Sequence, residues 1–303
     1  MISEPALNRL SAMFRGPDVS GTRYELVSVL GRGGMGVVYL ARDTALDREV
    51  ALKIVDRLVD ETHARGGNAS ALAHEARILA RLEHPGIVPV HDFGELPDGR
   101  LFYAMKRVRG DRLDRWMTSD RDLAERLGVF LRVCDAVAFA HAHGVIHRDL
   151  KPENVMVGEF GEVLVLDWGV AADLARDPGL GTRDSQIVGT PDFMAPEQAR
   201  GDADADHRVD VYALGVVLET IGDAAPLVAI ARKARSSDAS ARYQDVRALA
   251  ADVSRFLAGR AVGAHRERLV DRLGRVGRRY RLPILLVLTY LVVRVVLLWL
   301  FRV

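Results

Sequence analysis

The apolar pattern of the 303-residue chain changes type near residue 110. Before that point, short runs rich in β-branched and aromatic residues alternate with turn residues, as in "YELVSVLG" and "EVALKIVD", which is typical of strands. After it, long segments with helical spacing dominate, such as "LAERLGVFLRVCDAVAFAHAHG". The sequence therefore predicts an α+β protein with a β-rich lobe at residues 23–108, a larger helical lobe at residues 109–258, and a cleft between them.

The composition excludes several classes of protein. The chain is 49% apolar and 27% charged, so most of it can fold around a buried core. Cys134 is the only cysteine, which excludes an intramolecular disulfide and a cysteine-based zinc site and favours a reducing compartment. Residues 1–22 lack the apolar run of a secretory signal, and we interpret them as a docking helix or a mobile extension.

The C-terminal part joins a basic segment to an apolar one. Residues 259–281 contain eight arginines, and residues 282–301 would span about 30 Å as a helix. At the centre of a bilayer, Arg294 makes the free energy of insertion about 2.5–3.5 kcal/mol less favourable. The Leu, Ile, Val and Phe residues together make it roughly 4.5–9 kcal/mol more favourable. We therefore expect a transmembrane helix at 282–301. Because basic flanks stay inside, the larger part is expected in the cytoplasm at the inner membrane.

Glycines recur between two strand-like runs in "LGRGGMGVVYLARD". Gly31, Gly33 and Gly36 have the spacing G-x-G-x-x-G, in which backbone amides can approach phosphate oxygens because no Cβ intervenes. The spacing alone is equally typical of a glycine-rich hairpin. A strand follows Gly36 where a dinucleotide-binding fold would have a helix, which excludes that fold.

Two charged residues fall on otherwise apolar surfaces. Lys53 lies in the strand-like "VALK", and Glu75 shares the inward stripe of the helical segment "ASALAHEARILARLE". An acid on an apolar face usually has a partner, so we expect Lys53 and Glu75 to pair. Lys53 is also one of four lysines among 42 basic residues, which indicates a site that needs a compact ammonium.

Asp149, Lys151 and Asn154 lie close together in the connection "VIHRDLKPENVMV", and Asp167 ends the apolar run "VLVLD". Carboxylate and amide oxygens are hard ligands that suit Mg²⁺ with a polyphosphate, and one carboxylate would remain to accept a proton. Ordinary turn aspartates are the simpler alternative. The joint order of these groups favours a site for phosphoryl chemistry.

Together, these motifs resemble those of the protein kinase family, specifically the bacterial eukaryotic-like serine/threonine kinases. The resemblance runs from about Tyr24 to Leu257 and rests on "GRGGMGVVY", "VALK", "HRDLKPEN", "DWG", "GTPDFMAPEQ" and "DVYALG". It implies the bilobal protein kinase fold and an enzyme that transfers the γ-phosphoryl group of Mg-ATP to Ser or Thr hydroxyls of proteins. Arg148 beside Asp149 favours control by autophosphorylation of the activation segment, and the apolar segment at 282–301 places the expected signalling at the membrane.

The resemblance assigns roles to individual residues. Asp149 would accept the proton of the substrate hydroxyl, Lys151 would neutralise the γ-phosphate, and Lys53, held by Glu75, would contact the α and β phosphates. The ligands of Mg²⁺ would be Asn154 and Asp167. The residues around the nucleotide would be Gly31, Gly33, Gly34, Gly36, Val38, Ala51, Lys53, Met105, Lys106, Val108 and Met156.

The resemblance also implies how the helical lobe is held together and regulated. Asp210 would anchor the connection "VIHRDLKPENVMV", residues 145–157, which we call the catalytic connection, and Glu197 would pair with Arg242. The regulatory residues would be Thr182 and Ser185 in the activation segment and Thr190 before "APE". Thr190 and "DLKPEN" favour Ser/Thr over Tyr specificity.

The sequence departs from the family pattern at three places. Trp168 replaces the usual Phe of D-F-G, in the same packing role beside His147, and Lys106 stands where the hinge often has an acid. Between Glu219 and Arg242 the helix that often docks protein substrates looks largely missing. An ATP-binding pseudokinase scaffold is therefore the alternative function, and a small-molecule phosphotransferase is a third. The expected partners are protein substrates, ATP and the membrane but no nucleic acid, and a homodimer stays open.

Overall fold

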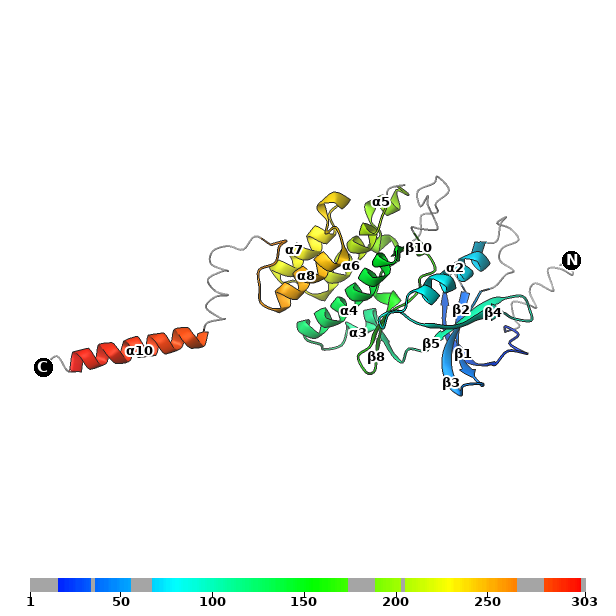
Figure 1. Cartoon of the computed structure of the whole chain (residues 1–303), viewed down its shortest axis with the longest axis horizontal. Helices are drawn as coiled ribbons and strands as arrows, with labels where there is room; N and C mark the ends of the chain where they lie inside the picture. The colour runs from blue at the N-terminus through cyan, green and yellow to red at the C-terminus, as the bar shows by residue number, and fades with distance from the viewer. Residues whose placement is uncertain are drawn as a thin grey trace.

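The computed structural model describes residues 16–33, 36–55, 67–173, 189–202, 205–265 and 281–300. Two lobes lie side by side, a β-sheet lobe from the first part of the chain and a helical lobe from the later part (Figure 1). This is the bilobal architecture that the sequence predicts. The helix expected near the N-terminus falls outside the described residues.

The N-terminal lobe is a five-stranded antiparallel sheet with the order β1-β2-β3-β5-β4. Its strands are β1 (Tyr24–Gly33), β2 (Gly36–Asp43), β3 (Arg48–Val55), β4 (Val90–Glu95) and β5 (Leu101–Lys106). The central strand β3 reads as a nearly continuous apolar run because both of its faces are buried. Helix α2 (Gly67–Arg81) packs on β3, β4 and β5 through its buried stripe, which includes Leu72 and Leu79.

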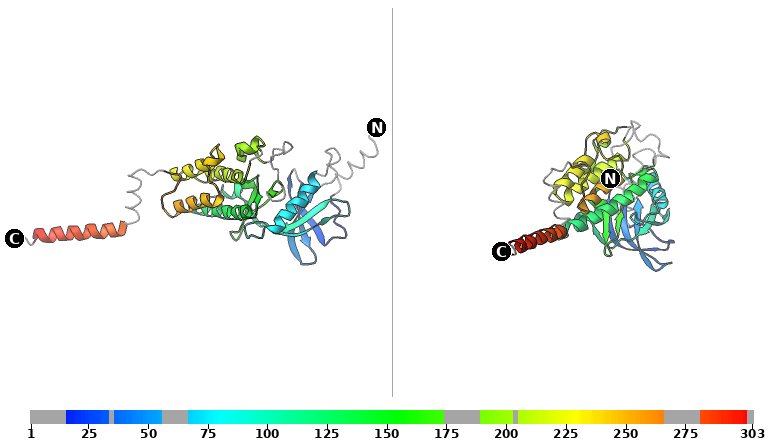
Figure 2. Two further views of the ribbon diagram at one scale, coloured as in Figure 1. Left: turned by 45° about the horizontal axis from the view of Figure 1, so that its top comes forward. Right: turned by 60° about the vertical axis from the view of Figure 1, so that its left-hand side comes forward.

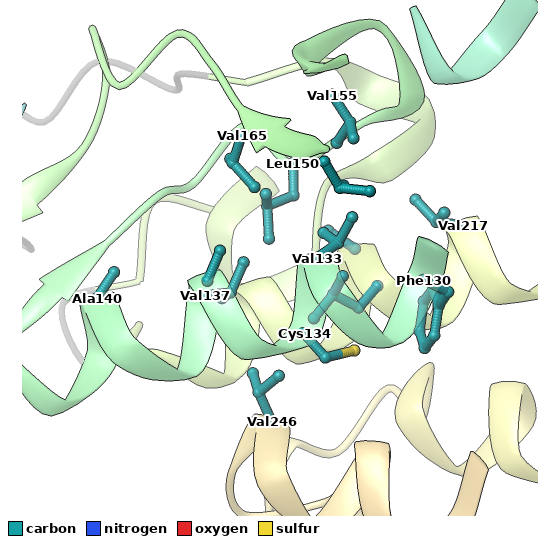
Figure 3. Packing of buried hydrophobic residues seen from close by; sticks show 14 of the residues in the cluster. Phe130, Val133, Cys134, Val137, Ala140, Leu150, Val155, Val165, Val217 and Val246 are labelled. Carbon is teal, nitrogen blue, oxygen red and sulfur yellow. The ribbon is translucent and has the colours of Figure 1, made fainter. Parts of the chain in front are cut away.

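The C-terminal lobe is built around helix α4 (Leu123–Ala142). This helix packs against α6 (Arg208–Ile221), α8 (Val246–Leu257), β7 (Val145–Ile146) and β9 (Val163–Val165). Asp122 caps the start of α4, since its side chain accepts a hydrogen bond from the Glu125 amide at 2.7 Å. Figure 3 shows Phe130, Val133 and Val137 of α4 among the buried residues of this core. The other helices are α3 (Leu113–Trp116), α5 (Pro196–Ala199), α6 (Arg208–Ile221), α7 (Ala225–Ala234) and α8 (Val246–Leu257).

Cys134 also belongs to the core around α4 (Figure 3). Burial raises the pKa of its thiol well above the ordinary value. The thiol therefore stays protonated at neutral pH and packs as a small apolar side chain.

Short elements hold the connection around Asp149. Strands β6 (Gly110–Arg112), β8 (Val155–Gly158) and β9 (Val163–Val165) form one small sheet, and β7 (Val145–Ile146) pairs with β10 (Ala172–Asp173). The 3₁₀ turns are η2 (Pro152–Asn154), η3 (Pro191–Phe193) and η4 (Ala239–Ala241). The catalytic connection runs from β7 through η2 into β8, so it is fixed at both ends.

The chain between α6 and α7 is short, as the sequence indicates. Only residues 222–224 separate the two helices. The helices also pack closely, because a Cβ at Gly215 would lie 2.7 Å from the Cβ of Ala234. This short connection leaves no room for a further helix between α6 and α7.

Helix α10 (Arg281–Leu300) is drawn away from both lobes in Figure 1 and in the left view of Figure 2. Among the described residues, no helix has both the length and the apolar content needed to cross a membrane. The transmembrane helix expected at 282–301 is therefore not confirmed. Its last residue, Phe301, lies outside the described residues.

Candidate active site

Asp210 on α6 anchors the catalytic connection through hydrogen bonds to its backbone. Its Oδ2 accepts hydrogen bonds from the His147 amide at 2.9 Å and from His141 Nε2 at 2.7 Å, and its Oδ1 accepts one from the Arg148 amide at 2.9 Å. These bonds fix Arg148 at a φ of 67°, a conformation that is uncommon for residues other than glycine. The predicted anchoring role of Asp210 is confirmed.

The environment of Asp210 also determines its ionisation. Burial opposes the charged form, but hydrogen bonds and charge from His141 and His147 outweigh it and lower the pKa of Asp210 below its ordinary value. The carboxylate is therefore ionised at neutral pH although it is 0% exposed.

Asp149 lies at the centre of a group of hydrogen bonds. Lys151 Nζ donates to Oδ2 at 2.6 Å, and Thr190 Oγ1 donates to Oδ1 at 2.8 Å. Asn154 Nδ2 donates to the Asp149 backbone carbonyl at 2.8 Å and to Oδ2 at 3.2 Å. These donors fix the orientation of the carboxylate. The sequence did not predict the contact with Thr190, because the contact depends on how the segment that contains Thr190 folds over Asp149.

Lys53 and Glu75 form the predicted ion pair between β3 and α2. Lys53 Nζ donates to Glu75 Oε1 at 3.0 Å and to Oε2 at 2.8 Å, and it also reaches Asp167 Oδ1 at 3.2 Å. Burial opposes the charge on Lys53, but Glu75 and Asp167 outweigh it and raise the pKa of the ammonium. Burial likewise opposes the charge on Asp167, and Lys53 lowers its pKa below the ordinary value. Lys53 therefore links Glu75 on α2 to Asp167.

Trp168 fills the position after Asp167 as a fully buried side chain, with 0% exposure. Its Nε1 donates to the Val165 carbonyl at 3.4 Å, and its ring lies 4.6 Å from the His147 ring, centre to centre. The predicted packing of Trp168 beside His147 is confirmed. The indole is accommodated because its N–H finds a backbone acceptor.

Asn154 and Asp167, the expected ligands of Mg²⁺, lie in two segments that a backbone hydrogen bond joins. Leu166 donates its amide to the Asn154 carbonyl at 2.8 Å, which joins the two connections next to Asp167. The amide nitrogen of Asn154 faces Asp149, so its side-chain oxygen lies on the opposite side of the planar amide. One carboxylate and one amide oxygen fit Mg²⁺, which usually takes few protein ligands together with phosphates and waters. No group of three or more His, Cys, Asp or Glu side chains suited to a metal occurs among the described residues.

Several of the residues expected around a nucleotide lie on strands of the two lobes. Val38 pairs with Lys53 across β2 and β3, Ala51 pairs with Met105 across β3 and β5, and Met156 lies on β8. Gly36 has a φ of 128°, and a Cβ there would lie 2.4 Å from the Ile54 carbonyl oxygen, so this turn requires glycine. Gly34 falls outside the described residues, as do Thr182 and Ser185.

A cavity of about 200 Å³ lies at a different place, beside residues 106–108, which follow β5. Its lining residues are Glu49, Arg107, Arg109, Glu159, Phe160 and Glu162. None of them belongs to the expected nucleotide set. The candidate active site is therefore the group of contacts around Lys53 and Asp149, and this cavity lies apart from it.

Glu197 on α5 and Arg242 form the predicted ion pair. Arg242 is buried, and its Nη2 donates to Glu197 Oε2 at 2.7 Å. Its Nε donates to the Ser236 carbonyl at 2.7 Å, and its guanidinium lies 5.1 Å from the centre of the Tyr212 ring. The guanidinium thus ties α5 and α6 to the segment that precedes α8.

Comparisons with known proteins agree with this geometry. The family model described as "Protein kinase domain" matches residues 24–255. The chain therefore belongs to the protein kinase family. The structural comparison finds the crystal structure of the Mycobacterium tuberculosis PknI kinase domain, with a TM-score of 0.62 and 26% identity, covering 79% of this chain and 98% of that one.

Curated relatives of the chain are bacterial serine/threonine-protein kinases. PknD of Chlamydia caviae is 34% identical over 296 residues, which cover 78% of this chain and 31% of PknD. The DNA damage-responsive kinase RqkA of Deinococcus radiodurans is 40% identical over 232 residues, which cover 74% of this chain and 32% of RqkA. The chain thus spans about a third of the length of these relatives.

Proposed function

We propose that the chain transfers the γ-phosphoryl group of Mg-ATP to serine and threonine hydroxyls of proteins. The observation that carries this proposal is the fixed carboxylate of Asp149, with Lys151 on one oxygen and Thr190 on the other. A general base needs such a fixed orientation toward the hydroxyl that it deprotonates. The bacterial serine/threonine-protein kinase relatives support the same activity.

Each part of the site would have one task in this reaction. Lys53 would contact the α and β phosphates, Lys151 would neutralise the γ-phosphate, and Asp149 would accept the proton of the substrate hydroxyl. Asn154 and Asp167 would hold Mg²⁺, which supplies positive charge next to the transferred group. The residues proposed to surround the nucleotide are Gly31, Gly33, Gly34, Gly36, Val38, Ala51, Lys53, Met105, Lys106, Val108 and Met156.

An ATP-binding scaffold without catalysis is the second candidate. The short connection of residues 222–224 favours it, because the segment that often docks protein substrates is reduced. The intact Lys53–Glu75 pair and the held carboxylate of Asp149 favour catalysis instead. The segment "GTPDFMAPEQ" opposes a small-molecule phosphotransferase.

Mass spectrometry after incubation of the full chain with Mg-ATP tests the proposed function. We expect phosphate on serine or threonine and none on tyrosine, with Thr182 and Ser185 as the regulatory candidates. Thr182→Ala should lower the activity several-fold, because phosphate there would supply an anion to the activation segment. If Thr182→Ala were as active as the wild type, Thr182 would not be a regulatory residue. A folded wild-type chain that binds ATP but carries no phosphate would favour the scaffold.

We also propose that the C-terminal part associates with the cytoplasmic membrane. Apolar side chains are exposed on all sides of α10, including Leu286 at 69%, Val292 at 61% and Trp299 at 77%. An apolar surface of this extent is unfavourable in water and typical of a membrane or protein contact. The arginines of residues 259–281 would favour the anionic inner leaflet.

Fractionation of bacterial cells tests this association. The full chain is expected in the membrane fraction, and a chain ending at residue 265 is expected in the soluble fraction. If alkaline carbonate did not extract the full chain from the membranes, the chain would be inserted. If it released the chain, the chain would be bound to the membrane surface. An equal distribution of the two chains would contradict the proposal.

A further inference from the structure

Tyr103 on β5 lies directly opposite Lys53 on β3. The two residues are register partners of an antiparallel pair, so their side chains project from the same face of the sheet. Lys53 Nζ lies 5.7 Å from the centre of the Tyr103 ring. The Tyr103 hydroxyl donates to Glu75 Oε1 at 3.0 Å. Tyr103 therefore contacts both members of the ion pair, and nothing in its sequence position indicates this.

These three side chains are enclosed by the fold. Glu75 and Tyr103 are each 1% exposed, and Lys53 is 7% exposed. Water therefore has little access to the Glu75 carboxylate. Its oxygens depend on Lys53 and Tyr103 for the hydrogen bonds described here.

The ammonium of Lys53 is already fully engaged in this structure. An ammonium carries three N–H groups. Three oxygens lie within hydrogen-bonding distance of Lys53 Nζ, namely Glu75 Oε1 at 3.0 Å, Glu75 Oε2 at 2.8 Å and Asp167 Oδ1 at 3.2 Å. A phosphate oxygen bound by Lys53 must therefore replace at least one of them.

The two oxygens of Glu75 differ in the hydrogen bonds that they would keep if Lys53 turned away from them. If Lys53 turns away from Oε1, that oxygen still accepts the hydrogen bond from Tyr103. If the Tyr103 hydroxyl were absent, the same movement would leave a buried, charged oxygen without a described donor, which is unfavourable. Of the two Glu75 oxygens, Oε1 is therefore the less costly one for Lys53 to release, because the Tyr103 hydroxyl stays bonded to it.

We propose that Tyr103 is a positioning residue for ATP binding: its hydroxyl holds Glu75 Oε1, so that Lys53 can direct one N–H to the phosphates and stay paired with Oε2. This inference rests on the proposed kinase function. The hydroxyl remains a donor at neutral pH because burial and the charge of Glu75 raise the pKa of Tyr103 well above its ordinary value. The same hydrogen bond ties α2 to β5 independently of Lys53.

The variant Tyr103→Phe in the full chain tests the proposal, because it keeps the ring and removes only the hydroxyl. We expect the Kd and the KM for Mg-ATP to rise about tenfold, which is the scale of one hydrogen bond to a charged group. We expect kcat, measured per folded enzyme, to stay within about twofold, because Tyr103 would act on binding and not on proton transfer. A loss of folded protein alone would lower the amount of active enzyme and leave KM unchanged.

A double-mutant cycle separates an effect through Glu75 from a general effect on the sheet. In a Glu75→Leu background, adding Tyr103→Phe is expected to change the Kd for Mg-ATP by less than about twofold. Tyr24→Phe is the matched control, because Tyr24 on β1 is also buried and donates to Asp92 Oδ2 at 2.8 Å, outside the site. That control is expected to leave the Kd and KM unchanged.

Three results would overturn the assignment of Tyr103. These are an unchanged KM in Tyr103→Phe, an equal rise of Kd in the Glu75→Leu background, and an equal rise in Tyr24→Phe. If the unmodified chain did not bind Mg-ATP at all, the proposed function itself would fail, and this inference with it.

Discussion

Asp149→Asn is expected to lower kcat for phosphoryl transfer by about 10²- to 10⁴-fold, which is the usual contribution of a positioned general base. The amide of Asn cannot accept the proton of a substrate hydroxyl. Its oxygen can still accept a hydrogen bond from Lys151 or Thr190, which now bind the carboxylate. We therefore expect the variant to fold and to bind Mg-ATP as the wild type does.

Steady-state kinetics and a nucleotide-binding titration on the same preparations check this prediction. Asp120→Asn is a suitable control, because Asp120 is exposed and lies in the turn before α4. The control should keep the wild-type kcat. If Asp149→Asn retained more than about a tenth of the wild-type kcat, Asp149 would not be the base.

Asp210→Asn is expected to destabilise the helical lobe and to reduce activity as a consequence. The carboxylate of Asp210 accepts hydrogen bonds from two backbone amides and from His141. Asparagine offers only one accepting oxygen, so at least one buried donor loses its partner. Each such donor costs about 1–3 kcal/mol of unfolding free energy. Urea unfolding of the two proteins at pH 7 measures this difference.

The pH dependence of the difference in unfolding free energy tests whether the charge of Asp210 causes it. Because the pKa of Asp210 is lowered in the folded protein, its ionisation contributes stability that is fully present above the ordinary carboxyl range near pH 4. This contribution is lost as the pH falls through the lower, folded value. The stability gap between the wild type and Asp210→Asn should therefore narrow as the pH falls below about 4. A gap that stayed constant down to pH 3 would contradict this explanation.

Much of the site could be predicted from the sequence because its residues lie in short motifs. The pairing of Lys53 with Glu75 followed from two charges on buried faces, and the structure confirms it. The pairing of Glu197 with Arg242 and the anchoring by Asp210 followed from the family resemblance and are also confirmed. In each case a buried charge needs a partner, so few alternatives remain.

Tyr103 and Thr190 show what the sequence could not give. Tyr103 reads as one more aromatic residue in an apolar strand, and its link to Glu75 depends on the register of β3 and β5. The hydrogen bond from Thr190 to Asp149 depends on how a distant segment folds back over the catalytic connection. Such contacts arise from tertiary packing, for which local periodicity carries no signal. The apolar segment at 282–301 read as membrane-spanning, which the structure does not confirm.

The transfer of labelled phosphate from ATP tests the central claim most directly. The purified full chain would be incubated with γ-labelled ATP and Mg²⁺ and a protein acceptor, and the labelled amino acids would be identified after hydrolysis. We predict labelled phosphoserine or phosphothreonine, which disappears when Mg²⁺ is chelated and in Asp149→Asn. If a folded chain that binds Mg-ATP transferred no label to any protein, itself included, it would not be an active kinase.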